Sequence, residues 1–225
     1  MDREFLRFQG AEWFDPDKQE TVVVGGAGGI GSWCSLFLAR ANFKVILIDF
    51  DIFEEHNLGG QFVELSGINQ HKVSAIQDAI SKFTTNRIST FTERIDESSM
   101  THKYMFGGFD NMTARKDMFN IWKRSWESYN SPLLIDGRLN LETFQIFCVT
   151  PNTADKYEKE YLFGEGEALE AICSMKQTSH AAAMIGAHMV GFFTNHICNV
   201  KLQNKVREIP FMYEYAIPMD LTVRL

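Results

Sequence analysis

The sequence predicts an α/β fold in which a mostly parallel sheet is flanked by helices. Short β-branched runs typical of buried strands alternate with segments whose apolar residues recur at helical spacing. The first strand is Thr21–Gly25, and a glycine-rich turn joins it to a helix, Gly29–Arg40, which precedes a second strand, Lys44–Ile48. A strand, helix and strand joined in this way form a βαβ unit, whose strands lie parallel and whose crossover is nearly always right-handed.

The same alternation continues through the rest of the chain. Helices are expected over residues 71–83 and 113–129, and a long, largely apolar helix is expected over Ser179–Leu202. Further strands are expected over residues 87–94, 104–108 and 132–136. The alternating run Thr143–Val149 and the extended segment 209–225 are expected to pair antiparallel. The expected fold is therefore α/β, with a Rossmann-like, mostly parallel sheet flanked by helices and antiparallel C-terminal strands.

Two segments stand outside this alternation. In residues 1–20, Arg3 and Arg7 flank an apolar pair, which predicts a short amphipathic helical arm before a proline turn. Residues 151–178 begin with a charged run that ends at a glycine break, and they predict a surface crossover segment, a type of loop that is usually functional. With 225 residues, 45% of them hydrophobic, the chain can bury one core, so a single domain is expected over 1–225.

The composition restricts the classes of partner. A formal net charge of −7 leaves no basic excess to neutralise a phosphate backbone, so no nucleic acid partner is expected. The longest apolar stretch, residues 181–198, contains two histidines and an asparagine and is too polar for a lipid-exposed span, so no membrane partner is expected. The cysteines form no C-x-x-C pair and follow no secretory leader, which favours a cytoplasmic location and disfavours structural zinc. They are Cys34, Cys148, Cys173 and Cys198.

The glycine-rich turn after the first strand predicts a phosphate site. Small residues let the backbone approach a phosphate, whose charge the free amides and positive end of the following helix stabilise. Asp49 follows about 20 residues later, where an acid accepts hydrogen bonds from a pair of ribose hydroxyls. NAD, S-adenosylmethionine and ATP all remain open here, as do a turn without ligand and an acid that merely meets solvent. The turn has the G-x-G-x-x-G pattern Gly26-Ala27-Gly28-Gly29-Ile30-Gly31.

The stretch that starts at Asp49 resembles a family signature. It contains Asp51, Asn57 and Gln61 at the spacing of D-x-D-x-V-x-x-x-N-L-x-R-Q, which is the signature of the ThiF/MoeB-type adenylating enzymes, relatives of the ubiquitin-activating enzymes. The resemblance covers most of residues 1–150 in the family's order. Its further matches are Lys72, Asp110-Asn111, Arg115, Asn120 and the N-terminal arginine-bearing segment.

The resemblance implies an ATP-dependent adenylyltransferase that binds ATP and Mg²⁺. The substrate would be the C-terminal carboxylate of a ubiquitin-like or sulfur-carrier protein or of a peptide, which attacks the α-phosphate and forms an acyl-adenylate. By this resemblance Asp49 would hold the ribose, Asn57 and Lys72 would contact phosphates, and Asp110 would hold or orient Mg²⁺. Asp51 and Gln61 would belong to the same cofactor-binding set, and the resemblance also implies a homodimer with the site near the protomer interface.

One departure from the signature is serious. Gly60 stands where the family has arginine before the glutamine, and glycine cannot supply a cation to the phosphates. Arg3 and Arg7 are candidate replacements, because an N-terminal arginine in this family often reaches the nucleotide of the partner protomer, and Arg7 is therefore counted as catalytic. Arg115 and Arg138 are weaker candidates.

Cys173 is the candidate acyl acceptor. It lies where the crossover segment rejoins the body, a region in which some relatives place a thioester or persulfide cysteine. Its thiolate would take the acyl group if Lys176 or a helix terminus lowered its pKa, whereas the alternative is a small buried side chain. Plain structural roles also remain open for other candidates: Asn57 as a turn residue, Lys72 as a solvated charge and Asp110 as a helix N-cap.

Two other functions compete with adenylation. Gly60, together with the absence of the paired zinc cysteines of the thiamine and molybdopterin members, favours a nucleotide- or partner-binding module that has lost catalysis. An NAD-dependent oxidoreductase would use the same glycine turn, but no pattern here matches its catalytic residues. His180, His188 and His196 recur without an accompanying carboxylate, so no metal site is expected at them.

Overall fold

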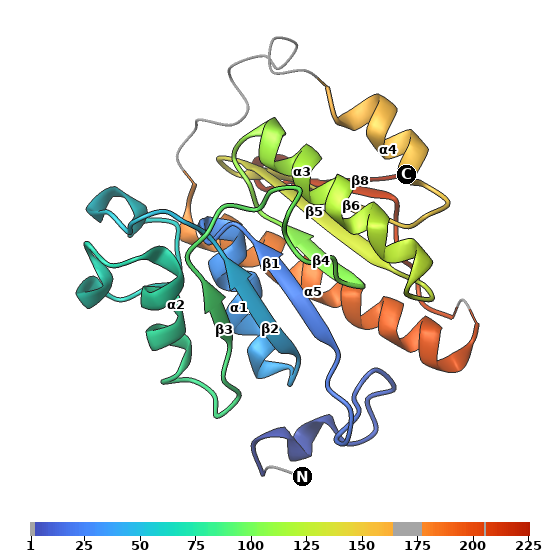
Figure 1. The fold of residues 1–225 in the computed structure, drawn as a ribbon, viewed down its shortest axis with the longest axis horizontal. Helices are drawn as coiled ribbons and strands as arrows, with labels where there is room; N and C mark the ends of the chain where they lie inside the picture. Colours follow the sequence, from blue (N-terminus) through green and yellow to red (C-terminus); the bar gives the residue numbers. More distant parts are fainter. Residues whose placement is uncertain (1–2, 164–176, 205) are drawn as a thin grey trace.

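One eight-stranded sheet organises the computed structural model, which describes residues 3–163, 177–204 and 206–225 (Figure 1). The strand order is β3-β2-β1-β4-β5-β6-β7-β8, with parallel pairing from β3 to β5 and antiparallel pairing from β5 to β8. This arrangement confirms the expected α/β fold with antiparallel C-terminal strands. The strands are β1 (Thr21–Gly25), β2 (Lys44–Ile48), β3 (Ser89–Phe91), β4 (Tyr104–Gly107), β5 (Leu133–Asn140), β6 (Thr143–Val149), β7 (Met212–Ala216) and β8 (Leu221–Arg224).

The strand order opens a crevice at the carboxyl ends of β1 and β4. The chain adds β2 and β3 on one side of β1 and then returns to add β4 and β5 on the other side. β1 and β4 pair in parallel up to Gly25 and Gly107, so the loops that follow both strands leave the sheet at the same edge. In open α/β sheets, ligands bind in the crevice at such a reversal of strand order.

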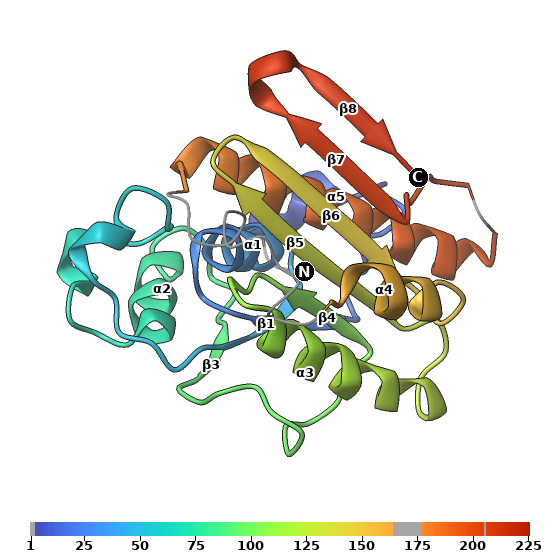
Figure 2. The ribbon, with the colours of Figure 1, turned by 90° about the horizontal axis from the view of Figure 1, so that it is seen from above.

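Helices cover both faces of the sheet (Figure 2). Successive residues of β1 point to opposite faces, so Val22 and Val24 pack in the core under α1 and α5, whereas Val23 packs in the core under α3 and α4. Burial on both faces explains why β1 is apolar throughout. The helices are α1 (Gly29–Arg40), α2 (Lys72–Ile80) and α5 (Ser179–Leu202) on the first face, and α3 (Met112–Lys123) and α4 (Ala154–Tyr161) on the second.

Several element boundaries differ from the expectation. The N-terminal arm is helical over Arg3–Phe8, where it forms a short 3-10 helix, η1. β3 is shorter than the expected 87–94, because it is an edge strand with β2 as its neighbour in the sheet. α3 ends at Lys123 and passes into another 3-10 helix, η4 (Arg124–Glu127). These differences lie at element ends and leave the order of elements as expected.

The first part of the surface segment expected over residues 151–178 contains a helix that the sequence did not predict, α4. Tyr157 of this helix is 1% exposed, and its ring lies 5.5 Å from those of both Phe119 and Phe147. The charged residues that suggested a loop occupy the solvent face of an amphipathic helix. Residues 164–176 lie outside the described residues.

A buried ionic network links β5 to both α3 and α4. Asp136 accepts hydrogen bonds from Arg115 Nη1, from Arg138 Nε at 2.9 Å and from the Tyr157 hydroxyl at 2.9 Å. The Arg115 and Asp136 side chains are each 3% exposed. Burial, reinforced by the charge of Asp136, raises the pKa of the Tyr157 hydroxyl, so Tyr157 stays protonated and donates.

This network gives Arg115 and Arg138 structural partners. Arg115 also donates to the carbonyl of Phe109, which holds the loop that precedes α3, and Arg138 donates to the carbonyl of Tyr161 at 2.9 Å, which holds the end of α4. The suggestion that Arg115 or Arg138 replaces the missing cation at Gly60 is therefore wrong, because Asp136 and backbone carbonyls already bind both guanidinium groups.

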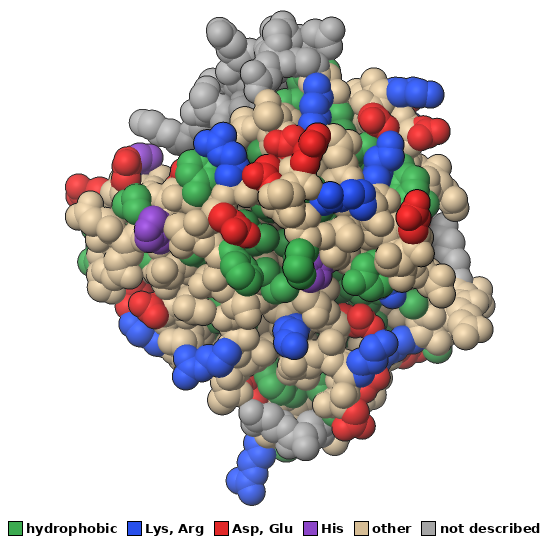
Figure 3. All heavy atoms as spheres, in the orientation of Figure 1, with side chains coloured by type: hydrophobic (Ala, Val, Ile, Leu, Met, Phe, Trp, Pro, Cys, Tyr) green, Lys and Arg blue, Asp and Glu red, His purple; other side chains and the backbone are tan. Residues whose placement is uncertain are grey.

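The charge of the surface and the apolar character of the helices can be compared with what nucleic-acid and membrane contacts require. On the face shown in Figure 3, Lys and Arg side chains lie among Asp and Glu side chains instead of forming one continuous basic patch. Within the described ranges, no helix combines the length and the apolar character that crossing a membrane requires.

We predict that Asp136→Ala lowers the free energy of unfolding by about 3–5 kcal/mol, because it leaves two buried guanidinium groups without their counterion. Glu158→Ala is the control, since it breaks the exposed pair between Glu158 and Lys123, joined at 3.0 Å, and should cost less than about 1 kcal/mol. Urea unfolding followed by circular dichroism measures both. Equal losses in the two variants would contradict the role given to the network.

Candidate functional site

A cavity of about 720 Å³ lies at the reversal of strand order. Four residues predicted to form the site, Gly28, Asp49, Lys72 and Asp110, all line it, although they come from four separate segments. These segments are the turn before α1, the end of β2, the start of α2 and the loop before α3. Gly26, Gly29, Asp51, Asn57 and Gln61 line the same cavity.

The glycine turn forms an open cradle at one side of the cavity. Gly26 has a φ of 87°, a backbone conformation that favours glycine, and nothing lies within 4 Å of a Cβ placed on Gly28. Gly28 is the N-cap of α1 and has no side chain to bond the amides of the first turn. Those amides and the positive end of the helix can therefore bind an anion.

Gly31 has a different role from the other glycines of the motif. A Cβ on Gly31 would lie 1.8 Å from the carbonyl oxygen of Gly26, so no larger residue fits between α1 and the turn. Gly31 is buried and is not among the residues that line the cavity. Its predicted place in the cofactor-binding set is therefore indirect, because it lets the helix start close to the strand.

Asp49 fastens the cradle to the end of β2. Its Oδ2 accepts a hydrogen bond from the Ala27 amide at 2.6 Å, and its Oδ1 accepts one from the Asp51 amide at 2.7 Å. Burial raises the pKa of the Asp49 carboxyl, and these two hydrogen bonds oppose that shift. Each carboxylate oxygen can accept a further hydrogen bond, so Asp49 can still bind hydroxyl groups.

Lys72 is a partly neutralised cation. Its Nζ lies 2.7 Å from Oδ2 of Asp51, and its amide donates to the Asp51 carbonyl at 2.9 Å. The Lys72 side chain is 12% exposed, so the solvated helix charge considered above is not what the structure shows. Two members of the predicted cofactor-binding set therefore form an ion pair at the cavity wall.

Asn57 and Gln61 present different polar groups to the cavity. Asn57 Oδ1 accepts from the Glu54 amide at 3.0 Å and caps the short 3-10 helix η2 (Glu55–Asn57), so it has a turn role as well as a place in the cavity wall. Gln61 Oε1 is buried and has no hydrogen-bond partner within the described part of the chain. A buried acceptor of this kind is costly unless a ligand or water satisfies it.

Asp110 is exposed at the start of α3. The N-cap of this helix is Asn111, whose Oδ1 accepts from the Ala114 amide at 2.8 Å, so the alternative that Asp110 itself is the cap is wrong. Among the described residues, no group of three or more His, Cys, Asp or Glu side chains is placed to hold a metal. Mg²⁺ is usually held by one or two carboxylates together with phosphate oxygens, and Asp110 fits that mode.

Sequence reasoning missed several residues of the cavity wall, among them Glu93, Arg94 and Gln177. Glu93 and Arg94 follow β3, where the rule that ligands meet the carboxyl ends of parallel strands could have indicated them. The Arg94 guanidinium carbon lies 4.5 Å from the centre of the Phe50 ring. Gln177 comes from just before α5 and carries no motif that the sequence could have revealed.

Two more predicted residues, Arg3 and Arg7, do not line the cavity. Arg3 and Arg7 lie in η1, at the amino ends of the strands, where Glu4 accepts a hydrogen bond from the Thr85 amide (Figure 1). Any contact between Arg7 and a nucleotide would therefore involve another protomer. Cys173 lies outside the described residues.

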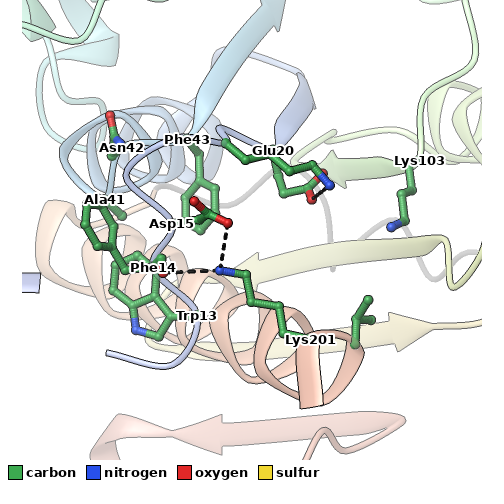
Figure 4. A pocket seen from close by; sticks show the side chains of 11 residues that line it. Trp13, Phe14, Asp15, Glu20, Ala41, Asn42, Phe43, Lys103 and Lys201 are labelled. Atoms are coloured by element: carbon green, nitrogen blue, oxygen red, sulfur yellow. Dashed lines mark hydrogen bonds and ion pairs between the residues drawn. The ribbon is translucent and has the colours of Figure 1, made fainter. Parts of the chain in front are cut away.

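A second cavity, of about 300 Å³, lies beside the N-terminal arm (Figure 4). Lys201 closes it with an ion pair to Asp15 at 3.6 Å and a hydrogen bond to the Phe14 carbonyl at 3.2 Å. Lys18 is paired with Glu20 at 3.2 Å. None of the predicted site residues lines this cavity, so the larger cavity is the candidate site.

The chain has a Rossmann-like α/β fold with a cavity at its reversal of strand order, and comparison with known proteins gives the family. Residues 8–218 match the ThiF family, so the chain belongs to the ThiF family. The chain is similar to ubiquitin-like modifier-activating enzyme 5 of Caenorhabditis elegans, with 27% identity over 139 residues. That match covers 51% of this chain and 33% of the worm enzyme, so the chain spans about one third of the length of this relative.

Solved structures of Escherichia coli MccB share the fold. MccB with MccA-N7isoAsn superimposes with a TM-score of 0.71 and 13% identity, covering 100% of this chain and 72% of that chain. MccB with ATP superimposes with a TM-score of 0.69 and 15% identity, covering 99% of this chain and 70% of that chain. At these identities the likeness concerns the fold.

We predict that the affinity for adenosine falls as the pH is lowered through the raised pKa of Asp49, because the protonated carboxyl loses an acceptor for the ribose hydroxyls. Adenosine is chosen because it carries no phosphate that titrates in this range. Calorimetry from neutral pH down to the lowest pH at which the protein stays folded measures the change. Asp49→Asn should bind weakly at every pH, and a wild-type affinity that is constant over this range would contradict the assignment.

Proposed function

We propose that the protein is an ATP-dependent adenylyltransferase that activates the C-terminal carboxylate of a ubiquitin-like or sulfur-carrier protein or of a peptide. The observation that carries the proposal is the convergence of Gly28, Asp49, Lys72 and Asp110 on one cavity. The ThiF family membership supports it, as do the structures of MccB solved with ATP and with MccA-N7isoAsn.

The proposed reaction is an in-line displacement at the α-phosphate of ATP. A carboxylate oxygen of the substrate forms a bond to the α-phosphorus, and the bond from that phosphorus to the bridging oxygen breaks, so pyrophosphate leaves with the electron pair. Such a displacement needs positive charge around the phosphate oxygens more than it needs a base. The amides after Gly28 and the ammonium of Lys72 supply donors. Asp49 holds the ribose, and Asn57 contacts a phosphate.

Mg²⁺ is part of the proposal because more carboxylates than cations line the cavity. The carboxylates of Asp49, Asp51, Glu93 and Asp110 line it together with two cations, Lys72 and Arg94. When bound, Mg²⁺ would neutralise phosphate charge and polarise the phosphoryl oxygens. Asp110 is the residue proposed to hold it.

Further parts of the proposal concern the partner protomer, the acyl acceptor and the location in the cell. We propose a cytoplasmic homodimer in which Arg7 of one protomer serves the nucleotide of the other, and Cys173 as the group that takes the acyl unit from the adenylate. The chain as a whole, residues 1–225, is proposed to act as one ThiF-like domain with an N-terminal arm and a crossover segment.

A nucleotide- or partner-binding module without catalysis is the second candidate. Two observations favour it: Gly60 provides no cation, and the ion pair with Asp51 reduces the positive charge that Lys72 offers. The two candidates differ in turnover, because a module would bind Mg-ATP without exchanging its pyrophosphate.

We predict ATP–pyrophosphate exchange that depends on a carrier protein or peptide with a free C-terminal carboxylate. Lys72→Met should lower the exchange rate by about 100-fold or more, because it removes an ammonium from the departing phosphates. Lys82→Met is the matched control, since Lys82 pairs with Glu64 at the surface and should leave exchange unchanged. Binding of Mg-ATP without exchange for any candidate carrier would favour the module instead.

We predict that EDTA weakens ATP binding by about tenfold or more, because four carboxylates at the cavity would then face an uncompensated triphosphate. Adenosine, which carries no phosphate, should bind equally well with and without EDTA. Asp110→Asn should reduce the difference that EDTA makes to ATP binding. Calorimetric titrations of both ligands measure this, and an ATP affinity independent of Mg²⁺ would contradict the proposed metal role.

A further inference from the structure

Gln177 connects two parts of the nucleotide cavity that are far apart in the sequence. It lies two residues before α5 and lines the cavity. A Cβ placed on Gly60 would lie 3.3 Å from Gln177 Cβ and 3.1 Å from the Gln177 carbonyl oxygen. A Cβ placed on Gly29 would lie 1.9 Å from Gln177 Oε1. The side chain of Gln177 therefore begins beside Gly60 and ends against the first residue of α1.

This side chain ends beside the free amides at the start of α1, which can bind an anion. Gly29 opens the first turn of α1, whose amides are free of side-chain caps. Within the described residues, the Gln177 carboxamide makes no hydrogen bond, so its polar groups are available to a ligand. A carboxamide carries a carbonyl oxygen and an NH₂ group on one planar unit, and rotation about its last torsion turns the NH₂ donors toward an anion.

We propose that Gln177 is a further phosphate-contacting residue of this cavity, donating from its carboxamide to the polyphosphate held by the turn at Gly28 and Gly29. The proposal rests on the proposed use of ATP. The cavity wall has two cations, and both have other partners: Lys72 pairs with Asp51, and Arg94 lies over the ring of Phe50. Gln177 would add a neutral hydrogen-bond donor to this wall.

The same geometry explains why a cation at position 60 would not serve this chain. A Cβ at 3.1 Å from the Gln177 carbonyl oxygen is tighter than ordinary contact, so a side chain at Gly60 must displace the backbone at Gln177. The Gln177 side chain already reaches the turn, because its Oε1 lies beside Gly29. A cation is therefore better introduced at position 177 than at position 60.

The test compares Mg-ATP and adenosine binding by calorimetry in three variants of Gln177. Gln177→Ala should weaken Mg-ATP binding by roughly 2- to 10-fold, the effect of one neutral hydrogen bond, and leave adenosine binding unchanged. Gln177→Glu should weaken Mg-ATP binding further, because its carboxylate repels the phosphates. Gln177→Lys should bind Mg-ATP more tightly than the wild type and lose that gain as salt is added.

His180→Lys is the matched control, because it adds the same charge three residues away. His180 is exposed, lies 3.4 Å from Glu142 and does not line the cavity, so Mg-ATP binding should stay at the wild-type value. Thermal unfolding of every variant checks that the fold is intact.

The outcomes distinguish a failure of the Gln177 proposal from a failure of the proposed function. Equal Mg-ATP affinity in the wild type and all Gln177 variants would overturn the role of Gln177 and leave the proposed function standing. Tighter binding by Gln177→Ala would also overturn it, since the carboxamide would then be an obstruction. If the wild type itself binds no Mg-ATP, the proposed function fails, and the role of Gln177 fails with it.

Discussion

Two hydrogen bonds to the carboxylate of Asp49 determine the shape of the cavity. They come from the amides of Ala27 and Asp51, at 2.6 and 2.7 Å, and they join the glycine turn to the end of β2. Hydrogen bonds to a charged group contribute about 1.5–3 kcal/mol each, which is enough to hold the start of α1 in one place. Because burial raises the pKa of Asp49, these amides are also what favours its ionised form. The residue expected to bind ribose thus also builds the phosphate cradle.

Most of the fold could be predicted because its signals are local. The run of β1, the glycine turn and the helical spacing of α1 each lie within a dozen residues, and parallel pairing follows from the βαβ order. The sequence did not predict α4, and this failure has a physical cause. Its helix buries little more than Ala154 and Tyr157, so its average composition is that of a charged loop, and only the position of these two residues on one face indicates packing.

The candidate site was predictable where the chain order brings residues to one edge of the sheet. Asp49 and Asp110 both follow parallel strands, so their convergence follows from topology. The ion pair of Arg115 with Asp136 joins residues 21 apart through the folded core, and no spacing in the sequence reveals it. Gln177 is harder still, because its contact with Gly60 depends on how the chain returns to α5.

The distribution of charge limits what this cavity can do. In the proposed reaction a carboxylate attacks a phosphate, so one anion must approach another, and the wall must offset the repulsion. The ammonium of Lys72 is shared with Asp51, and the start of α1 contributes only about half an elementary charge. In the proposed site, the chain's own residues would therefore bind and orient a nucleotide more readily than they would neutralise its charge. For this reason the choice between an enzyme and a binding module depends on positive charge brought from outside the described wall, by a metal ion or by a second protomer.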